Sequence, residues 1–162
     1  MDKRDLEQLL SDVADGSVAP ADALTRIQTA PTADLGFAQL DLSRGVRQGA
    51  GEVIYGAGKT AEQIAAIIEA LRDAGQEHVL VTRLDADKAA RTTELLADDI
   101  NLGYVPNAQL ALVGGMPSPT GNGRIVVACA GTSDLPVAEE AALTAEFYGN
   151  EVDRLYDVGV AG

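Results

Sequence analysis

Apolar residues recur at helical spacing near the start of the chain. Over residues 5–15 they fall at positions i, i+3, i+4 and i+7, which predicts one apolar helical stripe made of Leu6, Leu9, Leu10 and Val13. Gly16 is well placed to end this helix, and Pro20 is well placed to begin a second, short one. Two short helices cannot bury both apolar stripes alone. We therefore expect residues 1–34 to form a helical hairpin that docks on another part of the chain.

Residues 35–113 alternate between strand and helix patterns. Apolar and polar positions alternate over residues 35–42, and residues 52–55 form a second short apolar run, so each predicts an extended segment. A β-branched run at residues 79–82 predicts a further strand. Because alternating strands and helices are typical of a small α/β module, we assign residues 35–113 to one.

Two helices are expected within this module. The first begins after Thr60, where the sequence Thr60-Ala-Glu-Gln63 forms a capping box. Its apolar positions have helical spacing and are Ile64, Ile67, Ile68 and Leu71. The second helix is capped by Asp85 and is expected to continue to about Ala97.

The last part of the chain has the pattern of a parallel βαβ unit. Four Gly and two Pro among residues 114–123 indicate a linker. Residues 124–130 then predict a buried strand, residues 135–148 an alanine-rich helix, and residues 151–157 a second strand. One helix and two parallel strands leave sheet edges and one face uncovered. We therefore expect an α/β fold in which residues 124–162 are the truncated start of a doubly wound parallel sheet.

Composition and charge limit the classes of function. The chain has 162 residues, of which 46% are hydrophobic, as in an ordinary globular protein. Its 12 basic and 25 acidic residues give a net charge of −13, which argues against sequence-independent binding of nucleic acid. The N-terminus is charged, and no apolar run reaches the length of a membrane span. We expect a cytoplasmic protein that binds neither nucleic acid nor membranes.

Cys129 and His78 are the single cysteine and the single histidine of the sequence. They cannot form an internal disulfide or a Cys/His cluster for structural zinc. Both residues lie in apolar runs, so we favour a packed side chain over a catalytic role for each.

Residues 55–60 are similar to the second half of a phosphate-binding P-loop. The complete motif needs a glycine five residues before the Gly-Lys pair, and Val53 occupies that position. We therefore favour a glycine turn followed by a helix cap at Thr60.

Charged residues gather around the segments that flank the first helix of the module. Arginine suits the recognition of carboxylates and phosphates. The alternative is a solvated surface or internal pairing, such as that of Arg47 with Glu52. The set consists of Arg44, Arg47, Glu52, Lys59 and Arg83.

The sequence Gly131-Thr132-Ser133-Asp134 follows the first strand of the βαβ unit and opens its helix. Hydroxyl and backbone N–H groups at a helix N-terminus favour phosphate, and an aspartate carboxylate accepts hydrogen bonds from sugar hydroxyls. The alternative is that Ser133 or Asp134 is only a helix N-cap. We favour a nucleotide-binding turn.

Two sets of motifs resemble one protein family. Residues 123–141, followed by residues 156–162, are similar to the start of the carboxylase domain of the LarB family, which is related to the purine-pathway carboxylase PurE. Upstream motifs resemble the N-terminal domain of the same family. They are Arg44-Gly-Val-Arg47, Gly49, Glu52 to Gly56, Gly58-Lys-Thr60 and Thr82-Arg83.

This resemblance implies an enzyme of nickel-pincer cofactor biosynthesis. The implied reaction carboxylates the pyridinium ring of nicotinic acid adenine dinucleotide and hydrolyses its phosphoanhydride, releasing AMP. Carbon dioxide or bicarbonate is the implied co-substrate, Mg²⁺ is the candidate metal, and a homo-oligomer formed through the PurE-like domain is the expected assembly. The family's reactive cysteines lie beyond the position of Gly162, so we assign no catalytic residue and expect this chain alone to be inactive.

The resemblance also divides the candidate substrate-binding residues into a stronger and a weaker group. The first group is Gly131, Thr132, Ser133, Asp134, Asp157, Gly159 and Gly162. The second, weaker group is Arg44, Arg47, Glu52, Lys59 and Arg83. Two alternative functions stay open: a PurE-like carboxylase of aminoimidazole ribonucleotide, and a non-catalytic nucleotide-binding or assembly module.

Overall fold

The computed structural model describes residues 3–28, 32–42 and 51–159 of the chain. Its helices, and its strands paired both in parallel and antiparallel, confirm the expected α/β class. No helix among these residues is long and apolar enough to cross a membrane. The segment boundaries expected from the sequence, at residues 34, 113 and 123, stay predictions.

Two compact units make up the chain. The first comprises Met1–Glu52 and Ala66–Gln76, and the second comprises Val53–Ala65 and Glu77–Gly162. The candidate site residues that the structure describes lie in the second unit, with the exception of Glu52.

The first unit begins with a helical hairpin. Gly16, with a positive φ of 81°, lies between α1 (Lys3–Ala14) and α2 (Pro20–Gln28). The two helices contact each other, and Leu9 and Ala23 are buried. The expected hairpin is confirmed.

A short strand hairpin follows in the first unit. β1 (Thr32–Asp34) pairs antiparallel with β2 (Gln39–Asp41). The Asp34 carboxylate accepts a hydrogen bond from the Gly36 N–H at 2.8 Å, and Gly36 adopts a positive φ of 79°. This aspartate turn reverses the chain. The extended segment predicted for residues 35–42 is therefore confirmed only at β2, and residues 35–38 form the turn before it.

The second unit contains a four-stranded sheet with the order β3-β4-β6-β5. β3 (Val53–Tyr55) is parallel to β4 (Val79–Thr82), with a helix between them in the sequence. β6 (Leu110–Val113) is antiparallel to both β4 and β5 (Leu102–Val105). A short 3₁₀ helix, η1 (Pro106–Ala108), joins β5 to β6. The sequence analysis did not predict this last hairpin.

Both expected helix caps of the module are present. In front of α4 (Ala61–Asp73), the Thr60 N–H donates to the Gln63 side chain at 3.0 Å, and Thr60 Oγ1 accepts from the Gln63 N–H at 3.3 Å. Asp85 caps α5 (Ala86–Leu95) through its carboxylate. α5 ends slightly earlier than predicted, because the residue after it has an extended backbone.

The predicted parallel βαβ unit is confirmed. It consists of β7 (Arg124–Ala128), α6 (Leu135–Phe147) and β8 (Glu151–Leu155), and a short 3₁₀ helix, η2 (Thr132–Asp134), connects β7 to α6. Both strands end earlier than predicted, so the polar residues after each strand form a loop.

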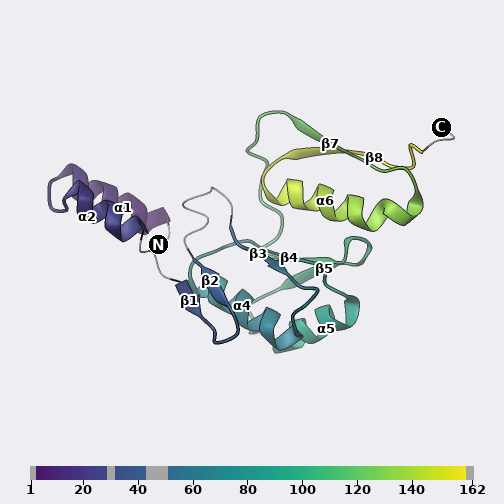
Figure 1. Ribbon diagram of the computed structural model, residues 1–162, viewed down its shortest axis with the longest axis horizontal. Coiled ribbons are helices and arrows are strands. Elements are labelled where there is room, and N and C mark those ends of the chain that lie inside the picture. The colour runs from purple at the N-terminus through teal and green to yellow at the C-terminus, as the bar shows by residue number, and fades with distance from the viewer. Residues whose placement is uncertain (1–2, 29–31, 43–50, 160–162) are drawn as a thin grey trace. The chain divides into compact units, whose positions relative to one another are not determined.

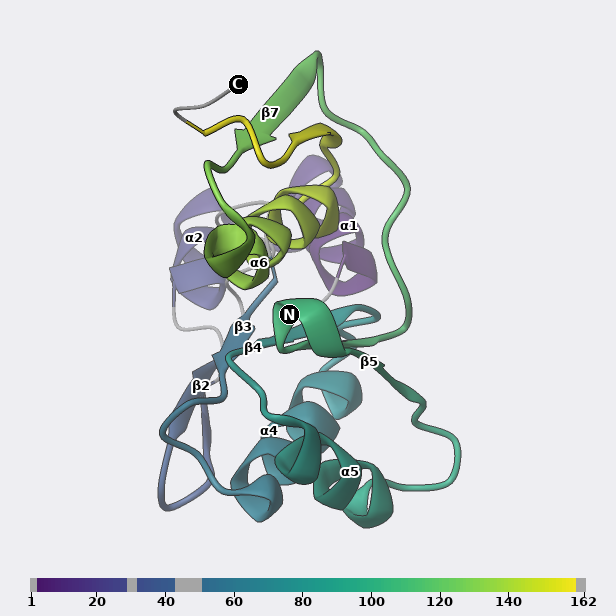
Figure 2. The same cartoon turned by 90° about the vertical axis from the view of Figure 1, so that its right-hand side faces the viewer.

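α6 lies between the β7–β8 ribbon and the four-stranded sheet, and α5 lies on the opposite side of that sheet (Figures 1 and 2). Phe147, the last residue of α6, is buried in a cluster with Leu80, Ala108 and Leu110. Because these three residues belong to β4, η1 and β6, the cluster joins α6 to the sheet.

The β7–β8 ribbon carries exposed apolar side chains. Val126 and Leu155 are 56% and 51% exposed, and Val158, just after β8, is 56% exposed. Among the described residues, β7 and β8 pair only with each other. The expectation that further strands or a partner cover this ribbon stays a prediction.

Replacing Phe147 by alanine is expected to lower the free energy of unfolding by about 3–5 kcal/mol, because truncation of a buried phenylalanine leaves a cavity. The matched control is Val137→Ala on the same helix, where the side chain is 54% exposed. It should change the free energy by about 0.5 kcal/mol or less. Urea unfolding followed by circular dichroism measures both variants, and equal effects would contradict the role of Phe147 in joining α6 to the sheet.

The Asp85 cap predicts a pH dependence of stability. The hydrogen bond from the Lys88 N–H, assisted by the Lys88 charge, holds the pKa of Asp85 below its ordinary value of 3.8. A carboxylate whose pKa is lower in the folded state than in the unfolded state stabilises the fold at pH values above its unfolded-state pKa. This stabilisation is lost as the pH falls through the folded-state pKa. The stability difference between wild type and Asp85→Ala should therefore shrink as the pH falls from about 4 to about 2. Urea unfolding across this range measures it, and a constant difference would contradict the cap.

Candidate functional site

The loops that follow β7 and β8 lie next to each other. The Cys129 N–H donates to the Leu155 carbonyl at 3.1 Å, and the Val158 N–H donates to the Cys129 carbonyl at 3.2 Å. The pairing of the two parallel strands thus continues past their ends. In an open α/β sheet, ligands bind outside the carboxyl ends of the strands, which is where these loops lie.

A close backbone approach sets the spacing of the two loops. We call residues 131–134 the first loop and residues 157–159 the second loop. A Cβ atom added to Gly159 would lie only 2.7 Å from the Ala130 carbonyl oxygen. Glycine at position 159 therefore allows the second loop to contact the chain directly in front of the first.

The first loop is a turn that bonds to itself. The Asp134 N–H donates to the Gly131 carbonyl at 3.0 Å, and Asp134 Oδ2 accepts from the Gly131 N–H at 3.2 Å. Asp134 makes no side-chain hydrogen bond that caps α6. Thr132, Ser133 and Asp134 are all exposed. The loop therefore presents two hydroxyls and one carboxylate to solvent at the start of a helix.

The second loop adds another carboxylate. Asp157 is exposed and adopts a positive φ of 60°, which is uncommon for a residue other than glycine. Carboxylates repel phosphate, so a phosphate at these loops needs the hydroxyls of Thr132 and Ser133 and the backbone N–H groups at the start of α6. The carboxylates of Asp134 and Asp157 suit the hydroxyls of a ribose.

Arg154 on β8 holds α6 against that strand. Its guanidinium forms two hydrogen bonds with Glu146, one of them from Nη2 to Oε2 at 3.0 Å, and its Nε lies 3.3 Å from Glu139 Oε2. The bonds to Glu146 and the negative charges of both carboxylates raise the pKa of Arg154, so its guanidinium stays charged. Sequence reasoning missed this contact, although Glu139 and Glu146 share one face of α6.

Tyr156 lies next to this ion pair and directly precedes the second loop. Its hydroxyl is buried and has no hydrogen-bond partner within the described ranges. Burial, followed by the Glu139 carboxylate, raises its pKa. Arg154 ties β8 to α6 just before the second loop.

Cationic side chains gather at the carboxyl ends of β3 and β4. The Gly56 N–H donates to the Thr82 carbonyl at 2.7 Å, and a Cβ atom on Gly56 would lie 2.9 Å from that oxygen. Lys59 Nζ donates to the Tyr55 carbonyl at 3.0 Å, and Lys88 Nζ donates to the Gly56 carbonyl at 3.1 Å. The two ammonium groups therefore lie on neighbouring carbonyls. The sequence analysis missed Lys88, whose signal is its position three residues after the Asp85 cap.

Arg83 follows β4 directly, and its side chain pairs with α6. Its backbone has a positive φ of 53°. Its Nε lies 2.7 Å from Glu140 Oε2 on α6. The structure thus shows internal pairing for Arg83, the alternative to a free anion-binding side chain. We call Lys59, Arg83 and Lys88 the cation cluster.

Three of the candidate residues, Arg44, Arg47 and Gly162, lie outside the described residues. Glu52 belongs to the first unit, where its N–H and its carbonyl both bond to the Gln76 side chain at 3.0 Å. Of the second group, Lys59 and Arg83 follow the paired strands β3 and β4. The first group, except Gly162, lies in the loops after the paired strands β7 and β8.

The residues set aside in the sequence analysis have local partners. His78 precedes β4, and its Nδ1 lies 3.1 Å from the Gly115 carbonyl oxygen. Cys129 is partly buried just after β7. Residues 55–60 form a turn in which the Lys59 N–H donates to the Gly56 carbonyl at 3.2 Å, as in the favoured interpretation.

No group of three or more His, Cys, Asp or Glu side chains is placed to hold a metal ion in the part of the chain that the structure describes. The Mg²⁺ implied by the resemblance therefore stays a prediction, and no step below depends on it.

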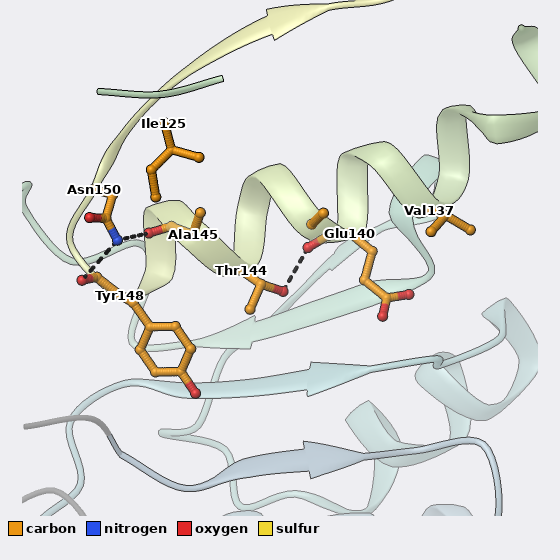
Figure 3. A pocket seen from close by; sticks show the side chains of 8 residues that line it. Ile125, Val137, Glu140, Thr144, Ala145, Tyr148 and Asn150 are labelled. Carbon is orange, nitrogen blue, oxygen red and sulfur yellow. Dashed lines mark hydrogen bonds between the residues drawn. The ribbon is translucent and has the colours of Figure 1, made fainter. Parts of the chain in front are cut away.

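A groove of about 540 Å³ runs along α6. The side chains of Val137, Glu140, Thr144 and Tyr148 lie along its wall, and Ile125 of β7 and Asn150 also line it (Figure 3). The Thr144 hydroxyl donates to the Glu140 carbonyl at 2.6 Å. Glu140, the partner of Arg83, is thus also part of this wall.

Gly159→Ala is expected to lower the free energy of unfolding by about 1–3 kcal/mol, because its Cβ would overlap the Ala130 carbonyl and push the two loops apart. Gly131→Ala is the matched control, since a Cβ there meets no atom within 4 Å and the backbone φ of −138° suits alanine. Thermal unfolding of both variants tests this expectation. Similar melting temperatures would show that the loops are not held by the contact at Gly159.

The comparison with known families agrees with the architecture of the second unit. Residues 32–114, which include the four-stranded sheet, match the family described as LarB/PurE-like N-terminal domain. An uncharacterized protein of Methanocaldococcus jannaschii is 33% identical over 134 residues, which cover 76% of this chain and 49% of that protein. The chain thus spans about half the length of this relative. The match to the family covers more than half of the chain, which therefore belongs to the LarB/PurE-like N-terminal domain family.

Proposed function

We propose that the chain is part of a LarB-type carboxylase that binds a nucleotide at the two loops. The observation that carries the proposal is the contact of the second loop with Cys129 and Ala130, directly in front of the first loop, at the carboxyl ends of β7 and β8. It combines hydroxyls, carboxylates and a helix N-terminus in one place, in a chain whose family is related to carboxylases. This combination suits a ligand that carries both ribose and phosphate.

The substrate proposed for the whole protein is nicotinic acid adenine dinucleotide. Its pyridinium ring is electron-poor and cannot attack carbon dioxide until a thiolate adds to the ring and supplies an electron pair. Carbon dioxide, directly or from bicarbonate, then forms the new carbon–carbon bond, and a ring proton leaves with loss of the thiolate. Water cleaves the phosphoanhydride and releases AMP. Cys129 is not assigned the thiolate, because it is partly buried beside a strand end.

In the proposed reaction, the residues of this chain bind the nucleotide and orient it. Thr132 and Ser133 donate to a phosphate, together with the first N–H groups of α6. Asp134 and Asp157 accept hydrogen bonds from ribose hydroxyls. Assembly into a homo-oligomer is part of the proposal, and the exposed Val126 of the ribbon supports burial against further protein.

The proposal is tested on the protein encoded by the full reading frame, because the chain spans about half of its relative. The protein is incubated with nicotinic acid adenine dinucleotide and ¹³C-bicarbonate. AMP release and ¹³C incorporation into the pyridine product are then measured. Asp134→Ala is expected to lower kcat/KM at least about tenfold, because the lost hydrogen bond leaves a ribose hydroxyl without a partner.

Asp98→Ala is the matched control, since Asp98 is an exposed aspartate away from both loops. It should leave kcat/KM within about twofold of wild type. An Asp134→Ala enzyme as active as this control would reject the binding site. Carboxylation of aminoimidazole ribonucleotide in place of the dinucleotide would reject the proposed substrate.

A further inference from the structure

Arg83 and Glu140 connect two parts of the second unit that are distant in the sequence. Arg83 lies at the end of β4 in the sheet, and Glu140 lies on α6 of the βαβ unit. Their side chains meet at 2.7 Å and are 44% and 20% exposed. The carboxylate is therefore at hydrogen-bond distance from a guanidinium that solvent still reaches.

The partners of the other two cations differ in kind. Lys59 and Lys88 donate to the neutral carbonyls of Tyr55 and Gly56 at 3.0 and 3.1 Å. The carboxylate of Asp85 lies farther from Lys88 Nζ, at 3.5 Å. Within the cation cluster, Arg83 thus has the shortest contact with a carboxylate. Glu140 pairs with the Arg83 guanidinium as a bound anion would.

This contact is built to be displaced. Ion pairs that are partly exposed are weak. A phosphate carries more charge than a carboxylate and can bind an arginine through two parallel N–H···O bonds. Two ammonium groups lie near the end of the same strand pair. They attract a polyphosphate more strongly than a singly charged carboxylate.

We infer that Glu140 is a built-in competitor that holds Arg83 until a phosphate-bearing ligand takes its place at the cation cluster. The inference rests on the proposed function, because the proposed nucleotide substrate is the ligand that carries the phosphate. α6 begins directly after the first loop, so displacement of Glu140 releases a contact between that helix and the end of β4. Glu140 then remains on the wall of the groove along α6 (Figure 3).

Pyrophosphate binding to the 162-residue chain tests the inference by titration calorimetry. Glu140→Gln keeps the shape of the side chain and removes its charge, so the pyrophosphate Kd should fall about three- to fivefold. The matched control is Glu94→Gln, which frees Arg91 from a carboxylate at 2.9 Å and changes the net charge equally. It should change Kd by less than about 1.5-fold. Circular dichroism confirms that each variant is folded.

Arg83→Gln completes the experiment as a double-mutant cycle. Because Glu140 masks the guanidinium in the wild type, Arg83→Gln should raise Kd more in the Glu140→Gln background than in the wild type. Additive effects, or a Kd for Glu140→Gln equal to that of Glu94→Gln, would overturn the inference. Failure of Glu140→Gln to bind pyrophosphate would overturn it as well.

The Arg83 Nε–H resonance gives a second readout in the wild-type chain. Its NMR signal is assigned by its absence in Arg83→Gln. Added pyrophosphate should move the signal, because the acceptor changes from carboxylate to phosphate, and an unmoved signal at saturation would overturn the inference. Neither readout needs turnover. If the protein does not carboxylate the dinucleotide but Glu140→Gln still lowers the pyrophosphate Kd, the proposed reaction is wrong and the role of Glu140 as competitor stands.

Discussion

The packing of α6 against the four-stranded sheet determines where the first loop lies. Phe147 is inserted among Leu80, Ala108 and Leu110, so the last turn of α6 is fixed by apolar burial. The other side of the same helix is tied to β8 by Arg154, through two carboxylates. A helix held from both sides presents its first turn in one position, and the first loop directly precedes that turn.

This arrangement also explains why two sets of polar residues occur in one unit. Parallel strands place their carboxyl ends at the same edge, and the unit contains two parallel pairs, β3–β4 and β7–β8. The loops after the first pair carry cations, and the loops after the second pair carry hydroxyls and carboxylates. Phosphate and ribose, the two polar parts of a nucleotide, need these different groups.

Local sequence patterns predicted the elements that are stabilised by local contacts. Ile64, Ile67 and Ile68 marked one face of α4, and Thr60 and Gln63 marked its start, because both signals lie within a few residues of each other. The first loop was found in the same way. The pairing of Arg83 with Glu140 could not be found, because it joins residues far apart in the chain. The β5–β6 hairpin was missed because its turn, at Pro106–Ala108, is a short 3₁₀ helix rather than a glycine turn.

The narrow gap between Gly159 and the Ala130 carbonyl has a consequence for recognition. Since the backbones already touch there, the separation of the two loops is established during folding and not on ligand encounter. The entropy of ordering the site is then lost before binding, which favours affinity for one ligand shape. Position 159 is therefore closed to any larger residue, because a side chain there would displace the peptide of Ala130.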